Sequence, residues 1–217
     1  MVSNFLLSDL DKRKDYRLMR RVLLCALLGL LACMTAAAQG AQDQLKISLK
    51  HNDDAGEVQT RNQLQRLLAQ YDCSKFIFTR DIVIDRDAVP PSHPVLTLHT
   101  RHRKDDELLL SAFVHEQIHW FLTQRGEQTE KAVRELKTVF PKVPIGFPAG
   151  ADSEESTYLH LLVNTLEYRA DKELLGELKA RQVMEFWATD HYTWVYRQVL
   201  DVGDKIRTVL RRYKLVI

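Results

Sequence analysis

The chain has 217 residues, of which 45% are hydrophobic and 28% are charged, with eight glycines and six prolines. This length suits one domain with a well-buried core, and the composition excludes collagen-like, low-complexity and largely disordered chains. The formal net charge is only +2, which gives no sign of the clustered basic face that nucleic-acid binding requires.

The amino-terminal 38 residues are predicted to be an export signal. Arg20 and Arg21 precede an apolar run of 13 residues from Val22 to Met34, and small residues in an A-x-A arrangement follow. This order is typical of a secretory signal peptide, and the run is well short of the roughly 20 residues that a transmembrane helix needs. We therefore expect cleavage after Ala38, export to the periplasm or out of the cell, and no permanent transmembrane anchor.

Two details of this leader stay open. Residues 1–18 include three aspartates, unlike the basic start of a signal peptide, so translation is expected to begin at Met19. Residues 30–33 also resemble a lipoprotein box, in which Cys33 would be lipidated and become the first mature residue. Cleavage after Ala38 instead leaves 25 basic and 26 acidic residues, with Cys73 as the one cysteine, so no internal disulfide can form.

The predicted mature chain, residues 39–217, reads as a single domain whose first half mixes strands and helices. Alternating and β-branched residues predict strands, and leucines at helical spacing predict a helix. The predicted elements are a strand at 45–49, a helix at 57–71, a strand at 76–84 and, after a proline-rich break, a strand at 95–100. The first half is therefore expected to be a small mixed α/β lobe.

The second half is predicted to be helical, so the expected fold class is α+β. Acidic residues at 105–107 suit a helix start, and residues 108–122 are apolar on most sides, so this helix should be buried, with Gly126 as its stop. The remaining predicted elements are an amphipathic helix at 129–140, a loop at 141–152, and helix from Ser153 onward, opened by Asp152 and Glu155 as a capping pair.

The buried helix carries an H-E-x-x-H motif at His115, Glu116 and His119. The four-residue spacing puts both imidazoles on one face of a helix, where they can bind one metal ion. Two histidines and a glutamate in an otherwise apolar helix would be costly to bury without a metal or hydrogen bonds. The motif therefore predicts a Zn²⁺ site.

A catalytic zinc site uses three protein ligands and one open position, so a third ligand must come from elsewhere in the chain. We expect this ligand to be Glu167, with His160 as the alternative. Glu167 belongs to a row of polar residues on one helix face, spaced by four, three and four positions: His160, Asn164, Glu167 and Asp171. Asp171 would accept the free ring N–H of a ligand histidine.

At these residues the sequence resembles the gluzincin metallopeptidases, whose H-E-x-x-H and E-x-x-x-D motifs are similar to HEQIH at 115–119 and EYRAD at 167–171. The E-Y-x-A-D form is particularly similar to that of the HtpX and CAAX prenyl endopeptidase family, whose members are embedded in membranes. The resemblance covers about 60 residues and implies a zincin-like fold. It also implies zinc ligands at His115, His119 and Glu167, a general base at Glu116 and an orienting carboxylate at Asp171.

These roles predict an exported zinc metallopeptidase that acts on polypeptides, in which zinc activates a water and Glu116 takes its proton. The reaction's oxyanion needs a further donor, for which we expect His191 first and Tyr192 second. The strand at 95–100 is expected to pair with an extended substrate, and the loop at 141–152 to cover the other side of the cleft. Two alternatives stay open: a zinc-bearing scaffold that binds an envelope partner without cleaving it, and a zinc amidase that acts on peptidoglycan.

Overall fold

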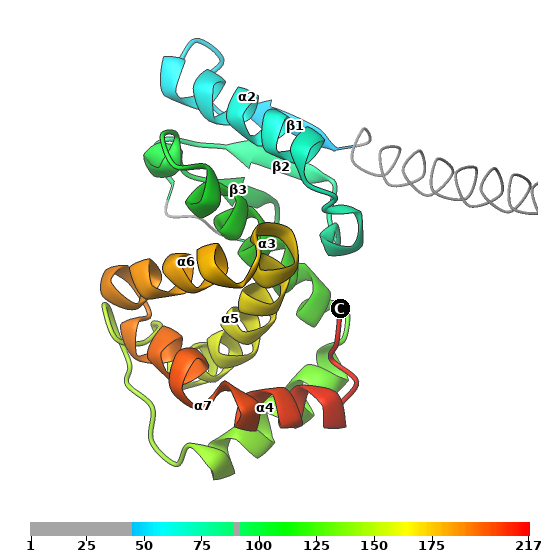
Figure 1. Cartoon of the computed structure of the whole chain (residues 1–217), viewed down its shortest axis with the longest axis vertical. Coiled ribbons are helices and arrows are strands. Elements are labelled where there is room, and N and C mark those ends of the chain that lie inside the picture. Colours follow the sequence, from blue (N-terminus) through cyan, green and yellow to red (C-terminus); the bar gives the residue numbers. More distant parts are fainter. Residues whose placement is uncertain (1–44, 89–91) are drawn as a thin grey trace, which may run out of the picture.

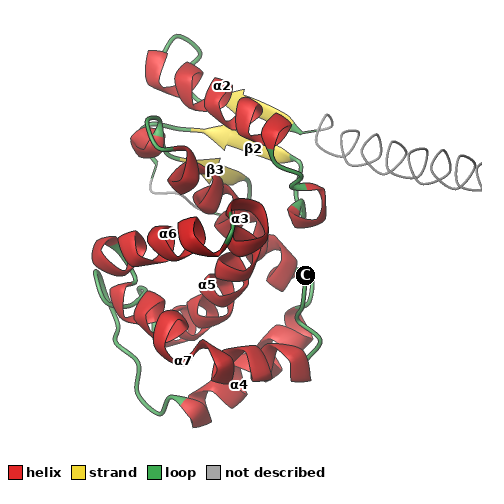
Figure 2. Cartoon of the chain, in the orientation of Figure 1, coloured by secondary structure: helices red, strands yellow, loops and turns green. Residues whose placement is uncertain are grey.

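The computed structural model describes residues 45–88 and 92–217. The predicted signal peptide, the start at Met19 and the lipoprotein box at Cys33 lie outside these residues. Within them, three short strands and one long α-helix come first along the chain, and five further α-helices follow (Figures 1 and 2). This mixture is compatible with the expected α+β class. None of the helices in these two ranges is both long and apolar enough to cross a membrane.

The amino-terminal lobe is a small parallel sheet with one helix packed beside it (Figure 1). Strand β1 (Lys46–Leu49) pairs with β2 (Asp81–Ile84), and β2 pairs with β3 (Leu96–Leu98), so the strand order is β1-β2-β3. Parallel neighbours need a crossover connection, and helix α2 (Ala55–Gln70) supplies the one between β1 and β2. The predicted strands at 45–49 and 95–100 and the predicted helix at 57–71 are confirmed.

The strand predicted at 76–84 is wrong in its first half. Residues Ser74–Phe76 form a short 3-10 helix, η1, and β2 covers only the second half. The cause is Gln117, whose Oε1 accepts hydrogen bonds from the backbone N–H groups of Phe78 at 2.7 Å and Thr79 at 2.8 Å, and whose Nε2 donates to the Thr79 carbonyl oxygen at 2.9 Å. These bonds occupy the backbone groups that a strand would pair with its neighbours.

Replacing Gln117 by Ala should lower the free energy of unfolding by about 3 kcal/mol, because two backbone N–H groups would lose their acceptor beside a fully buried position. Urea denaturation would measure the loss. Gln124→Ala is the matched control, since this residue directly follows the same helix and donates to the Phe78 carbonyl oxygen from an exposed position. Equal losses in the two variants would contradict the structural role of Gln117.

The second half is helical, as predicted, and consists of α3 (Asp106–Thr123), α4 (Gly126–Val139), α5 (Glu154–Leu175), α6 (Glu177–Asp190) and α7 (Thr193–Arg212). Helix α3 lies between the sheet and the pair α5 and α6, and it contacts β3 as well as both helices (Figure 1). Buried apolar residues from both halves of the chain form one hydrophobic cluster around it. The H-E-x-x-H helix is therefore the central element of the molecule.

Two helix boundaries differ from those predicted. Gly126 does not end the buried helix, which stops at Thr123; it is instead the first residue of α4. Helix α5 is capped by Ser153, whose hydroxyl accepts a hydrogen bond from the Ser156 N–H at 3.1 Å, and not by the predicted pair of Asp152 and Glu155. A serine hydroxyl one residue further along satisfies the same free N–H groups at the helix start.

Candidate metal centre

A cavity of about 550 Å³ lies between the sheet lobe and the helical lobe. All the predicted site residues except Asp171 line it: His115, Glu116, His119, Glu167, His191 and Tyr192. The end of β3 contributes Leu98 and His99, and the loop at 141–152 contributes Phe147, Gly150 and Asp152. The tertiary structure thus brings segments from five parts of the chain to one cavity.

Three histidines gather in this cavity: His115 and His119 from α3, and His160 from α5. One nitrogen from each ring lies within 4.8 Å of the other two. The Nε2 atoms of His115 and His119 are 3.3 Å apart. Two nitrogens bound at about 2.0–2.1 Å to one tetrahedral zinc would be about 3.4 Å apart, so the spacing of this pair fits zinc.

The three imidazoles are in the neutral form that a metal requires. Burial lowers the pKa of His115 to about 4 and the pKa of His160 to about 3. Burial, with a smaller contribution from the charges of His115 and His160, holds the pKa of His119 well below its usual value. A neutral imidazole offers a lone pair, so no ring proton has to be displaced near neutral pH.

In two of the three rings, a hydrogen bond determines which nitrogen is free to bind a metal. The Nδ1 atom of His115 lies 2.8 Å from Glu167 Oε2, and the Nδ1 atom of His160 lies 2.7 Å from the carbonyl oxygen of Ser156. Because both partners are acceptors, each Nδ1 donates its proton and each Nε2 keeps its lone pair. Metal-binding histidines typically make this outer hydrogen bond.

Glu167, the ligand expected from the sequence, lies beside these histidines with both oxygens already bonded. Its Oε1 accepts from the hydroxyl of Ser111 at 2.7 Å, and its Oε2 accepts from His115 Nδ1 and, at 3.1 Å, from the hydroxyl of Tyr196. Burial raises the pKa of Glu167, whereas the hydrogen bonds from Ser111 and Tyr196 lower it. In this geometry Glu167 accepts the ring N–H of His115, and the third nitrogen that lies near the other two belongs to His160.

Asp171 does not line the cavity, and its hydrogen bond runs to Ser111 rather than to a histidine. Its Oδ2 is 2.9 Å from the hydroxyl oxygen of Ser111, and its Oδ1 has no hydrogen-bond partner among the described residues. The sequence pattern alone does not point to Ser111 as a site residue. The one signal in the sequence is that Ser111 is a polar residue four positions before His115 and thus on the same face of an apolar helix.

Glu116 lines the cavity next to the three histidines. Its carboxyl group makes no side-chain hydrogen bond within the described part of the chain. Burial, and secondarily the charge of Glu167, raises the pKa of Glu116 well above its usual value. A raised pKa suits a carboxylate whose task is to accept a proton during a reaction.

His191 and Tyr192 form the turn between α6 and α7 and face the same cavity. The Nδ1 atom of His191 lies 2.7 Å from Asp190 Oδ2, and Asp190 is also paired with Arg101 at 2.5 Å. Since Nδ1 donates to a carboxylate, Nε2 of the neutral His191 ring is an acceptor. Burial lowers the pKa of His191, so this neutral form is favoured.

Tyr192, unlike His191, offers a hydroxyl group that can donate a hydrogen bond into the cavity. Its backbone is left-handed, with φ of 46°, a conformation that costs a non-glycine residue free energy and is concentrated at functional sites. Its ring packs on His160, with 4.1 Å between ring centroids. Burial raises the pKa of Tyr192 to about 12, so its hydroxyl keeps its proton at neutral pH and can donate it to an oxygen atom.

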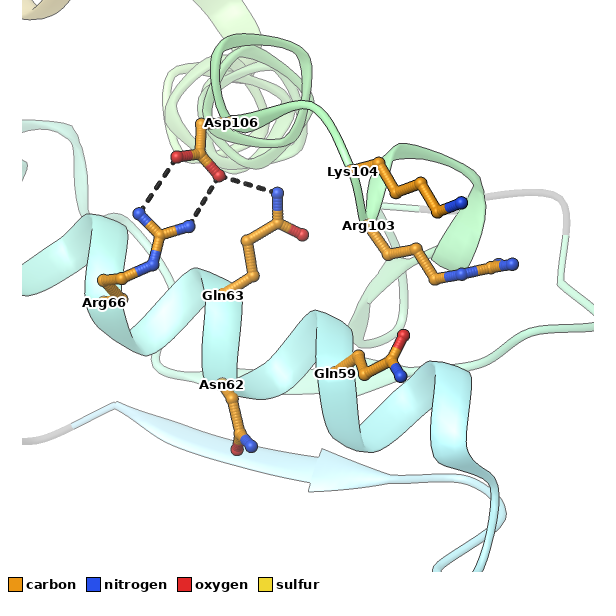
Figure 3. A pocket seen from close by; sticks show the side chains of 7 residues that line it. All are labelled: Gln59, Asn62, Gln63, Arg66, Arg103, Lys104 and Asp106. Carbon is orange, nitrogen blue, oxygen red and sulfur yellow. Dashed lines mark hydrogen bonds and ion pairs between the residues drawn. The ribbon is translucent and has the colours of Figure 1, made fainter.

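A second pocket, of about 510 Å³, lies beside α2 and the start of α3 and holds none of the predicted site residues (Figure 3). In it, Asp106 accepts hydrogen bonds from Gln63 at 2.9 Å and from Arg66 at 2.9 and 2.7 Å. These bonds tie the first turn of the metal-motif helix to α2.

Comparisons of this chain with protein-family models, with curated proteins and with solved structures find no match. The function proposed for it therefore depends on the residues and distances of the cavity itself.

Proposed function

We propose that the chain is a zinc-dependent peptidase with a zincin-like arrangement, in which His115, His119 and His160 hold the metal and Glu116 is the general base. The observation that carries this proposal is the meeting of three neutral imidazoles, with nitrogens within 4.8 Å, beside a carboxylate in a large cavity. Glu167 belongs to the centre as the acceptor for the ring N–H of His115. The export signal predicted at residues 1–38 would deliver the enzyme to the periplasm or out of the cell.

Zinc bound by these residues would supply Lewis-acid chemistry, which lowers the pKa of a water molecule and polarises a carbonyl group. The protein's own groups would handle protons and charge. Glu116, with its raised pKa, would take a proton from the attacking water and return it to the leaving amine. Tyr192 would donate its hydroxyl proton to the oxyanion in a hydrogen bond.

This assignment reverses the order expected for the two oxyanion donors. A neutral His191 ring that donates Nδ1–H to Asp190 has no proton left on Nε2, so it would donate to an oxyanion only as the imidazolium ion. Burial opposes that charged form. Tyr192 carries a donor proton at every pH below about 12.

A polypeptide substrate fits the surroundings of the centre. Strand β3 pairs only with β2 among the described residues, so one edge of it is free for an extended chain. Leu98, its last residue, and the adjacent His99 line the cavity. On the loop at 141–152, Phe147 also lines the cavity and is 79% exposed, which offers an apolar contact to a bound chain.

The full chain, purified as its host processes it, should contain about one zinc per molecule, and the His115→Ala variant should contain none. Elemental analysis would measure both. His93→Ala is the matched control, because His93 also lines the cavity but lies outside the group of three, so this variant should keep its zinc. A wild-type chain that stays free of metal after reconstitution with zinc would refute the proposed function.

A further inference from the structure

Behind the histidines lies a layer of buried polar side chains, of which the proposed function uses only Glu167. Its members come from four helices and are Ser111 of α3, Glu167 and Asp171 of α5, Trp187 of α6 and Tyr196 of α7. Ser111, Glu167 and Asp171 are completely buried. Groups in such a layer make their hydrogen bonds to other protein groups and not to bulk water, so the protons of the layer can be counted.

The hydroxyl of Ser111 is the group that both carboxyl groups contact, so the proton count begins there. Its oxygen lies 2.7 Å from Glu167 Oε1, 2.9 Å from Asp171 Oδ2 and 3.2 Å from the indole nitrogen of Trp187. An indole N–H can only donate, and a serine hydroxyl has a single proton to donate. Ser111 can therefore donate to one of the two carboxyl groups, and the other must donate to Ser111. That second carboxyl group carries a proton.

The partners of the two carboxyl groups decide which one is protonated. Glu167 already accepts from three donors, namely Ser111, His115 and Tyr196, so neither of its oxygens is left to donate. Among the described residues Asp171 hydrogen-bonds only to Ser111 and its Oδ1 has no partner, so an ionised Asp171 would be a nearly unsolvated charge. The 2.7 Å contact to Glu167 also has the short length typical of a hydroxyl that donates to a carboxylate.

We propose that Asp171 is a neutral carboxylic acid that positions the metal centre through a chain of hydrogen bonds. Its O–H donates to Ser111, the hydroxyl of Ser111 donates to Glu167, and Glu167 accepts the ring N–H of His115. Asp171 is thus a positioning residue, because it acts through Ser111 and Glu167. The effect of Asp171 on zinc binding rests on the function proposed above. The location of the proton on Asp171 does not depend on that function.

The electrostatic surroundings agree with this assignment. Burial raises the pKa of Asp171 well above its usual value, and the charge of Glu167 raises it further. Two buried carboxyl groups that share one hydroxyl cannot both ionise at low cost, so the pair retains a proton.

The test is a pair of isosteric changes. Asp171→Asn imitates the neutral acid, since its amide N–H can donate to Ser111, and it should keep the zinc dissociation constant within about 3-fold of the wild-type value. Glu167→Gln replaces one acceptor oxygen by an NH₂ group, which then faces groups that themselves donate. This change should weaken zinc binding by about 10- to 100-fold. Competition with a chelating dye would measure both affinities, and urea denaturation of the metal-free proteins would measure stability.

Asp171→Ala is the third variant, and it should lose the zinc affinity that Asp171→Asn retains, because alanine cannot donate to Ser111. The inference would be overturned if Asp171→Asn lost as much zinc affinity as Asp171→Ala. It would also be overturned if Glu167→Gln kept its zinc affinity while Asp171→Asn lost it. If the wild-type chain binds no zinc, the proposed function fails by itself. The urea midpoints then still locate the proton, because Asp171→Asn should leave the midpoint unchanged and Glu167→Gln should lower it.

Discussion

Replacing Glu116 by Gln should lower kcat for peptide hydrolysis by about 10³-fold, while zinc content stays at about one per chain. The amide has the shape of the carboxyl group but cannot accept a proton from a water molecule, and Glu116 is not one of the three nitrogen donors. Release of labelled peptides from casein would measure the rate, and elemental analysis would measure the metal. The proposal predicts that catalysis is lost and metal binding is kept.

Glu107→Gln is the control for this experiment, because Glu107 lies on the same helix and pairs with Lys179 at the surface. Unchanged hydrolysis by Glu116→Gln would refute the general-base role. A wild-type protein that holds zinc but cleaves no polypeptide would favour one of the two alternatives. Release of fragments from purified peptidoglycan would identify the amidase, and its absence would favour the scaffold that binds an envelope partner.

Replacing His160 by Ala should remove zinc during purification, because one of the three nitrogens would be lost from the centre. Glu167→Ala should weaken binding less, since in this geometry Glu167 orients His115 from outside. Loss of such an outer partner typically costs about 10- to 100-fold in metal affinity. Titration of each metal-free variant with zinc, in competition with a chelating dye, would compare the two effects directly.

The control for both changes is His93→Ala, which alters another histidine of the same cavity. A larger loss of zinc affinity in Glu167→Ala than in His160→Ala would make Glu167 the third ligand, as expected from the sequence. In that case Glu167→Ala would lose its zinc and His160→Ala would keep it, and the hydrogen bond between Glu167 and His115 would have to open when the metal binds.

Local sequence pattern was sufficient for several parts of this structure. The run at 108–122 is apolar on most sides, and it forms the buried central helix. The spacing of the H-E-x-x-H motif places His115 and His119 on one face of that helix, where their Nε2 atoms are 3.3 Å apart. The polar row on α5 was also identified correctly as one face. In each case the information is helical periodicity, which depends on a few neighbouring residues.

The strand predicted at 76–84 is a case in which the local sequence pattern gives the wrong secondary structure for half of the segment. Its β-branched and aromatic residues favour a strand, yet Gln117, far away in the sequence, occupies the backbone of Phe78 and Thr79. A hydrogen bond between distant segments overrides the local preference, and no pattern within nine residues reveals it.

The sequence by itself determined that this protein has a helix with two histidines on one face and a second helix with a row of polar residues on one face. Only the tertiary structure decided that His160 stands with His115 and His119, that Glu167 bonds the outer nitrogen of His115, and that Asp171 reaches Ser111 instead. Helical spacing decides which residues share a face, but it does not decide how far one helix slides along another. That alignment of α3 with α5 is set by the packing of the whole hydrophobic cluster, to which both halves of the chain contribute.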